Sequence, residues 1–188
     1  MRCTSYETSV AADEQDRALV RAFLEGDPKG EAAAGLVDRY ERRVFTIALR
    51  MLGNVQDAED VTQAVFCNVF ASMQSYDPQY RVFSWIYRMT VNESLNHLKR
   101  RKPMVTLDER SSIPASAAAA DDAVEAEDLV ARAMMDLTTN DRAVVVLRHF
   151  RFLSYEEIAS VLEVPVRTVK SRLFTARERL RVALLAHI

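Results

Sequence analysis

The chain has 188 residues, 49% of them hydrophobic, which is enough for apolar cores in one domain or two small ones. Its 4 glycines and 5 prolines are too few for the frequent turns of an all-β protein, so we predict an all-α fold. The formal net charge of -2 excludes a uniformly basic nucleic-acid binder, and attention shifts to how the charges are distributed.

Several classes of protein are disfavoured by what the sequence lacks. No stretch approaches the roughly 20 uninterrupted apolar residues of a membrane span, and residues 1–16 lack the apolar run of a signal peptide. We therefore expect a cytoplasmic protein without membrane insertion. The 2 cysteines and 3 histidines are scattered, and no Gly-rich nucleotide loop or catalytic triad occurs, so we expect no disulfide, metal, cofactor or enzymatic activity.

The first predicted domain, residues 16–102, follows an N-terminal tail of residues 1–15. Apolar residues recur at threes and fours through most of it, and Gly53-Asn54 is a plausible helix stop. Cys67 falls among apolar residues of one helix and is expected to be a small buried thiol. The predicted helices span about 16–26, 31–52, 57–73 and 82–101.

Residues 103–127 lose this periodicity, because prolines, serines and a run of alanines replace it. We predict a flexible linker between two helical domains. Its acidic end, residues 121–128, offers one hypothesis for regulation: these carboxylates could shield the basic segments of the same chain.

The second predicted domain, residues 128–188, contains a helix-turn-helix. Ser154 is followed three residues later by Glu157, which is the pattern of a capping box at a helix start. Glu163-Val164-Pro165 then interrupts the helix, and a second helix begins at about Arg167. Two short helices joined by a tight turn are typical of DNA-binding helix-turn-helix motifs.

The second helix of this motif has an apolar stripe, and its other faces carry the side chains that a major groove would meet. Arginine and lysine can donate to guanine or phosphate, serine and threonine can do either, and an exposed phenylalanine can touch a thymine methyl group. The alternative is a solvated basic face, with Phe174 packed against the other domain. The expected DNA contacts are Arg167, Thr168, Lys170, Ser171, Arg172, Phe174, Thr175 and Arg177.

Four segments together resemble the extracytoplasmic-function sigma factors, the minimal group of the bacterial sigma family. Asp57-Ala58-Glu59-Asp60-Val61-Thr62-Gln63 and Phe83-Ser84-Trp85-Ile86-Tyr87-Arg88 resemble the family's region two. The segments 153–159 and 164–174 resemble its region four. The resemblance covers about residues 16–102 and 128–184, which leaves the linker and the chain ends outside it.

The resemblance implies a protein that binds core RNA polymerase and promoter DNA, and whose partner we expect to be an anti-sigma factor. Region four would read the upstream promoter element. The residues implied to bind the polymerase are Asp57, Glu59, Asp60 and Gln63, at a helix N-terminus where the dipole stabilises carboxylates. Those implied to bind the start-proximal element are Tyr76, Tyr80, Arg88, Asn92, Asn96, Lys99, Arg100 and Arg101.

The start-proximal residues have suitable chemistry. Asparagine amides can pair with base edges, the basic cluster at 99–102 can hold phosphates, and the loop 76–80 is the candidate wall of a pocket for a flipped base. Phe83 and Trp85 also invite a stacking role, but large aromatics at helical spacing are mainly core residues.

Three positions depart from the family's usual pattern, which often has Gly at Arg167, an acid at Ala64 and a base at Thr175. Promoter preference therefore does not transfer from relatives. Two other functions remain open: a free-standing helix-turn-helix regulator whose first domain senses a ligand or dimerises, and a signalling adaptor that binds only proteins.

Overall fold

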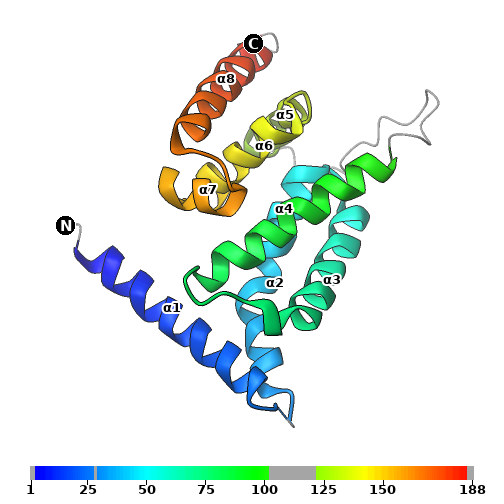
Figure 1. Cartoon of the computed structure of the whole chain (residues 1–188). Coiled ribbons are helices and arrows are strands. Elements are labelled where there is room, and N and C mark those ends of the chain that lie inside the picture. The colour runs from blue at the N-terminus through cyan, green and yellow to red at the C-terminus, as the bar shows by residue number, and fades with distance from the viewer. Residues whose placement is uncertain (1–2, 28, 102–121, 186–188) are drawn as a thin grey trace.

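The computed structural model describes residues 3–27, 29–101 and 122–185, and every regular element in these ranges is helical, which confirms the all-α fold (Figure 1). None of these helices is both long and apolar enough to cross a membrane. The first domain contains α1 (Cys3–Leu24), α2 (Glu31–Leu52), α3 (Val55–Ala71), the 3-10 turn η1 (Met73–Ser75) and α4 (Val82–Arg101). The second contains α5 (Asp122–Met135), α6 (Thr139–Val145), the π-helical turn η3 (Val146–Phe150), α7 (Tyr155–Leu162) and α8 (Val166–Leu185).

Helix α1 starts at Cys3, so most of the stretch that we expected to be a tail is helical. A buried polar group holds α1 against α2: the Asp16 carboxylate is 4% exposed, accepts a hydrogen bond from the Tyr40 hydroxyl and pairs with Arg39 at 2.6 Å. Burial and the Asp16 charge raise the pKa of Tyr40, which keeps its hydroxyl protonated as a donor. Apolar periodicity does not reveal an attachment of this kind.

Helix α2 supplies much of the first domain's core, since it packs against α1, α3 and α4. Its fully buried side chains recur at intervals of three or four residues, as one face of a helix requires. Helices α2 and α4 have the expected bounds, and α3 begins and ends two residues earlier than expected. The fully buried residues of α2 are Leu36, Tyr40, Val44, Ile47, Ala48 and Met51.

Gly53 allows the chain to leave α2 and enter α3 at once. Its φ of 71° is left-handed, and its N–H donates to the Leu49 carbonyl, which closes the last turn of α2. The Asn54 side chain then accepts from the Asp57 N–H at 3.0 Å and caps α3. A β-carbon on Gly53 would lie 2.7 Å from the sulfur of Met135 in α5, so this glycine also permits close packing of the second domain.

Helix α5 begins at Asp122, inside the segment that we expected to be a linker. Alanine and glutamate between 122 and 128 favour helix even without large apolar residues. Residues 102–121 and the acidic side chains of 121–128 lie outside the described residues, and so does the shielding hypothesis that depends on them.

The helix-turn-helix forms as expected, from α7 and α8. The Ser154 side chain accepts from the Glu157 N–H at 3.1 Å, and the Glu157 carboxylate accepts from the Ser154 N–H at 2.8 Å, which completes the capping box. Glu163 ends α7 in a left-handed conformation with φ of 53°. Helix α7 packs against α8. The buried residues of α7 are Ile158 and Val161, and those of the apolar stripe of α8 are Val169, Leu173 and Ala176.

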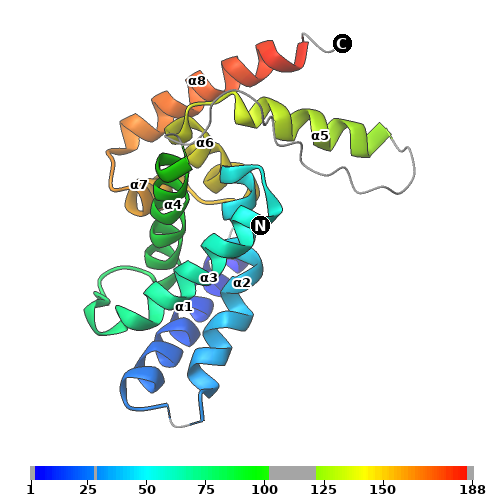
Figure 2. The same cartoon turned by 90° about the vertical axis from the view of Figure 1, so that its right-hand side faces the viewer.

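The two domains touch along α2 and α4. In both views α7 lies beside α4, whereas α8 runs along the side of the second domain that faces away from α1 to α3 (Figures 1 and 2). The buried Arg142 of α6 donates to the Met51 carbonyl in the last turn of α2 at 2.5 Å, and to the Met135 carbonyl of α5 at 2.7 Å. One guanidinium therefore joins the carboxyl ends of two helices, where the helix dipole favours a cation.

Candidate functional site

Helix α8 presents most of its expected DNA contacts to solvent. Its apolar stripe is buried against α6 and α7, and Arg179 pairs with Asp141 of α6 at 3.0 Å, which fixes the helix on its domain. Phe174 is 70% exposed, so the alternative in which it packs against the other domain is wrong. The exposed residues are Arg167, Lys170, Ser171, Phe174 and Arg177, and the half-buried ones are Thr168, Arg172 and Thr175.

The polar strip of α4 divides into an open half and a covered half. Asn92, Asn96, Lys99 and Arg100 are exposed along the carboxyl half of the helix. Arg88, in the amino half, has only 22% of its side chain exposed. Arg101 is the last residue of α4, but its side chain is not among those that the structure describes.

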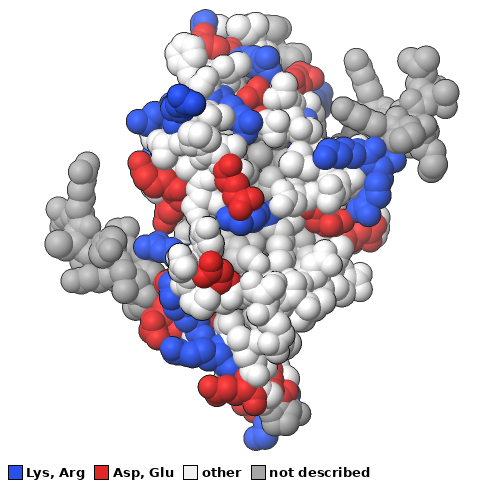
Figure 3. Space-filling model, viewed as in Figure 1, with Lys and Arg blue, Asp and Glu red and all other residues white. Residues whose placement is uncertain are grey.

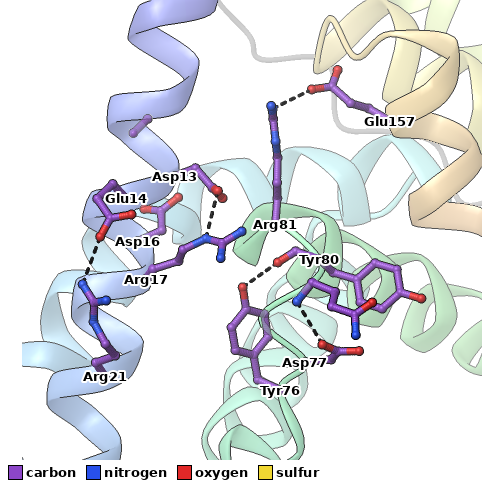
Figure 4. Close-up of polar contacts among 12 residues, drawn as sticks. Asp13, Glu14, Asp16, Arg17, Arg21, Tyr76, Asp77, Tyr80, Arg81 and Glu157 are labelled. Atoms are coloured by element: carbon purple, nitrogen blue, oxygen red, sulfur yellow. Dashed lines mark hydrogen bonds and ion pairs between the residues drawn. The ribbon is translucent and has the colours of Figure 1, made fainter.

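The loop before α4 brings two of the expected site residues together. Tyr80 is 45% exposed, and the Arg88 guanidinium carbon lies 5.4 Å from the centroid of its ring. The Tyr76 hydroxyl donates to the Tyr80 carbonyl at 2.7 Å, which fixes the loop from within (Figure 4). Burial raises the pKa of Tyr76, so its hydroxyl stays protonated as a donor.

Aromatic side chains at the start of α4 pack against one another and against this loop. The Tyr76 ring lies 5.3 Å from the Trp85 ring, and the Phe83 ring lies 5.7 Å from the Tyr87 ring, measured between centroids. Phe83 and Trp85 are partly buried and pack against the core, as expected. Tyr76 therefore contributes more as a support than as an open stacking surface.

Two arginines of the first domain reach the helix-turn-helix of the second. Arg81 Nη1 donates to Glu157 Oε1 at 3.1 Å, across the gap between the start of α4 and α7 (Figure 4). Arg88 Nη1 donates to Glu163 Oε1 at 2.7 Å, and Arg88 Nη2 donates to the Ser160 carbonyl at 2.9 Å. These contacts, which we call the α4–α7 contact, explain why Arg88 is covered.

Three of the four residues expected to bind the polymerase have exposed side chains on α3. Glu59, Asp60 and Gln63 are exposed near the amino end of α3. Asp57 differs, because its carboxylate lies 3.1 Å from His97 Nε2 of α4 and its side chain is mostly covered. The structure thus gives Asp57 a role within the domain, joining α3 to α4, in addition to any contact with a partner.

A groove of about 570 Å³ runs beside these acids between α2 and α3. Glu59 and Gln63 lie on its edge, and aromatic side chains of both helices line it. Cys67 also lines the groove and is exposed, so our expectation of a buried thiol is wrong. The periodicity of α3 suggested burial, but the packing of α2 leaves this face uncovered. The apolar lining consists of Val37, Phe45, Phe66 and Phe70.

Charged side chains are unevenly distributed on one face of the molecule (Figure 3). Basic side chains gather over α8 and near the far end of α4, while acidic and basic atoms touch in the middle of the face. A nearly neutral chain therefore still carries separate basic surfaces, which is what binding to phosphate groups requires. In the described part of the chain, no group of three or more His, Cys, Asp or Glu could hold a metal ion.

The residues that join the two domains are not marked by any pattern in the sequence. Arg81 was not singled out, and Glu157 was assigned only to the capping box. Neither periodicity nor a motif marks these pairs, because they join residues 75 and 76 positions apart. The same holds for Arg151, whose guanidinium carbon lies 5.6 Å from the centroid of the Tyr87 ring, 64 positions earlier in the chain.

Comparisons with known families give two matches. The model of sigma-70 region 2 matches residues 36–103, and that of sigma-70 region 4 matches residues 127–180. The ECF RNA polymerase sigma factor SigW of Bacillus subtilis is 32% identical over 175 residues, which cover 86% of this chain and 92% of SigW.

Solved structures have the same fold. CnrH, in complex with the cytosolic domain of CnrY, superimposes with a TM-score of 0.68 at 26% identity, over 91% of this chain and 97% of CnrH. RpoE of Bartonella quintana, in complex with the anti-sigma factor NepR, has a TM-score of 0.66 at 20% identity, over 80% of this chain and 95% of RpoE.

Proposed function

This chain belongs to the sigma-70 family as an extracytoplasmic-function sigma factor, and we propose that three of its surfaces divide the work of promoter recognition. It binds core RNA polymerase and directs initiation at specific promoters. One surface would bind the polymerase, a second the melted strand near the start site, and a third the upstream duplex.

The polymerase surface consists of the exposed acids of α3 and the neighbouring groove. Glu59, Asp60 and Gln63 are free of packing constraints at the positive end of the helix dipole, yet can still attract basic residues of a partner. The aromatic groove between α2 and α3 adds apolar area beside these charges. A helical partner such as the clamp helices of the polymerase fits this combination.

The start-proximal surface consists of the loop 76–80 and the polar strip of α4. Tyr80 and Arg88 lie together, and Asn92, Asn96, Lys99 and Arg100 continue the strip along the helix. Exposed amides can pair with unstacked bases, while the basic residues hold the phosphates. Holding an extruded base here would offset the few kcal/mol that unstacking costs.

The upstream surface is the exposed face of α8. Arg167, Lys170 and Ser171 lie in its first two turns, which is where recognition helices contact base edges. Phe174 and Arg177 lie further along the same face. The single observation that carries the proposal is this one: a buried apolar stripe on α8 leaves basic and polar groups exposed on the opposite side.

We further propose that the chain acts by binding alone and in the cytoplasm, while the polymerase supplies the chemistry. An anti-sigma factor is the expected regulator, because the family commonly uses one and because CnrH and RpoE were each solved with a protein partner.

Reconstituted transcription with purified core polymerase and a promoter library tests this proposal. Arg167→Ala should weaken holoenzyme binding by about 1–3 kcal/mol and relax preference at one upstream base pair if Arg167 contacts a base. Arg88→Ala should impair opening of the duplex more than initial binding. Arg181→Ala, nearly four turns beyond Arg167 on α8, is the matched control and should behave like the wild type.

Two outcomes would point to the other functions. Tight, specific duplex binding without polymerase would favour a free-standing regulator. No promoter binding even with polymerase present would favour an adaptor that binds only proteins.

A further inference from the structure

In the α4–α7 contact, two arginines beside or within the proposed DNA surface of the first domain donate hydrogen bonds to acceptors of the second domain. Arg88 makes two hydrogen bonds to α7 and its turn, at 2.7 and 2.9 Å, and Arg81 makes one at 3.1 Å. The side chains of Arg81 and Arg88 are only 31% and 22% exposed as a result. Several of the N–H groups that these arginines could donate to phosphates are therefore already hydrogen-bonded within the chain.

The acceptors resemble those of a nucleic-acid backbone. Glu157 and Glu163 are carboxylates, and the Ser160 carbonyl belongs to the last turn of α7, whose carbonyls carry the negative end of the helix dipole. A guanidinium binds carboxylates and phosphates with the same planar set of donors. Arg88 thus caps α7 in the way in which it would hold a phosphate group.

We propose that α7 occupies Arg81 and Arg88 in the free chain and so masks the amino half of the start-proximal DNA surface until the two domains separate. Arg81 then becomes a further contact to the melted strand. This inference rests on the proposed function of α4, since masking has a consequence only if the strip binds DNA.

The mask is partial and reversible. Asn92, Asn96, Lys99 and Arg100 stay exposed on the other half of the strip, so the DNA strand has a place to bind first. Arg88 Nε is buried and has no hydrogen-bond acceptor in the described part of the chain, so the contact leaves one donor unused. Ion pairs at this exposure are individually weak, which suits a contact that a stronger partner displaces.

Neutral glutamine at both acidic positions tests the masking directly. Glu157→Gln keeps the capping box, because glutamine can replace glutamate at that position, and the double variant E157Q/E163Q removes both charges. Its affinity for a single-stranded oligonucleotide of the non-template start-proximal sequence, measured by fluorescence anisotropy, should rise about two- to tenfold over the wild type.

The control variant E156Q/E178Q removes the same number of charges from exposed positions of α7 and α8. It corrects for the general gain in DNA affinity when negative charge is lost. Equal affinities of E157Q/E163Q and E156Q/E178Q would overturn the masking proposal.

An interdomain distance measurement gives a second readout that needs no DNA. Spin labels at Cys67 on α3 and at a cysteine replacing Ser171 on α8, with Cys3→Ser, report the separation of the two domains. The E157Q/E163Q chain should give a broader distribution with more long distances than the control variant. Identical distributions, together with identical affinities, would reject the contact as a mask.

The preformed holoenzyme separates this inference from the proposed function. The glutamine variants should open promoters like the wild type once polymerase is bound, because the mask acts on the free chain. If Arg88→Ala also opens promoters normally, the proposed DNA role of α4 fails, and the masking proposal fails with it. If Arg88→Ala is defective but the free glutamine variants equal their control, only the masking is wrong.

Discussion

At the residue scale, Phe152 combines an unfavourable backbone conformation with an exposed aromatic side chain. Its φ of 57° is left-handed, a conformation that bulky side chains rarely adopt, and its ring is 84% exposed. It lies between η3 and the cap residue Ser154, in the turn that leads into α7. The phenyl ring gains little packing in return for the backbone strain.

We predict that Phe152→Gly stabilises the protein. Relief of the left-handed strain contributes about 1–2 kcal/mol, and the greater freedom of glycine in the unfolded chain offsets about 0.5–1 kcal/mol of it. The net gain should raise the melting temperature by about 1–4 °C in a thermal scan. Phe152→Ala removes the same ring but keeps a β-carbon, so it should not stabilise. A lower melting temperature for the glycine variant would show that the ring makes stabilising contacts.

At the element scale, α3 shows what periodicity can and cannot reveal. The pattern placed this helix to within two residues and its acids at the correct end. It did not show that α2 leaves one side of α3 uncovered, so Cys67 was expected in the core and lies instead in the aromatic groove. The exposure of a face depends on what packs there, and residues of α2 far away in sequence decide it.

Cys67 therefore provides a chemical probe of the polymerase surface. In a Cys3→Ser background, we predict that core polymerase slows alkylation of Cys67 by maleimide about tenfold or more, because docking in the groove excludes the reagent, as burial in interface cores generally does. The rate is measured by mass spectrometry over time. A cysteine at Ser171 on α8 is the control, and it should remain reactive when polymerase is bound without DNA. Equal rates at Cys67 with and without polymerase would contradict docking at this groove.

At the scale of the whole molecule, Arg142 helps to hold the second domain against α2. Its guanidinium is buried and donates hydrogen bonds to three backbone carbonyls, those of Met51 in the first domain and of Met135 and Leu137 in the second. Burial lowers the pKa of Arg142 from its usual value, and within the described residues its hydrogen bonds all go to backbone carbonyls rather than to a carboxylate. The domains are thus joined by a polar contact as well as by apolar packing.

We predict that Arg142→Met lowers the free energy of unfolding by about 1–3 kcal/mol or more, because buried carbonyls lose a charged donor that methionine cannot replace. The midpoint of urea unfolding, followed by circular dichroism, should fall accordingly. Arg181→Met, at an exposed position on α8, is the control and should change stability by less than about 0.5 kcal/mol. Equal midpoints for the two variants would show that water replaces the lost donors.

The sequence by itself determined α2, α3 and α4 to within two residues, the capping box, the helix-turn-helix and the family, because these depend on neighbours within about four residues or on short motifs. Helical periodicity also indicated which side of α8 is exposed, and it indicated the exposed carboxyl half of the polar strip of α4, whereas Arg88 in the amino half is covered. Only the tertiary structure decided that α1 is helical from Cys3, that Cys67 is exposed, and that Arg88 is bound by α7. These features depend on contacts between residues that are dozens of positions apart in the sequence. Packing and charge pairing between helices stabilise them, and no local sequence pattern encodes such contacts.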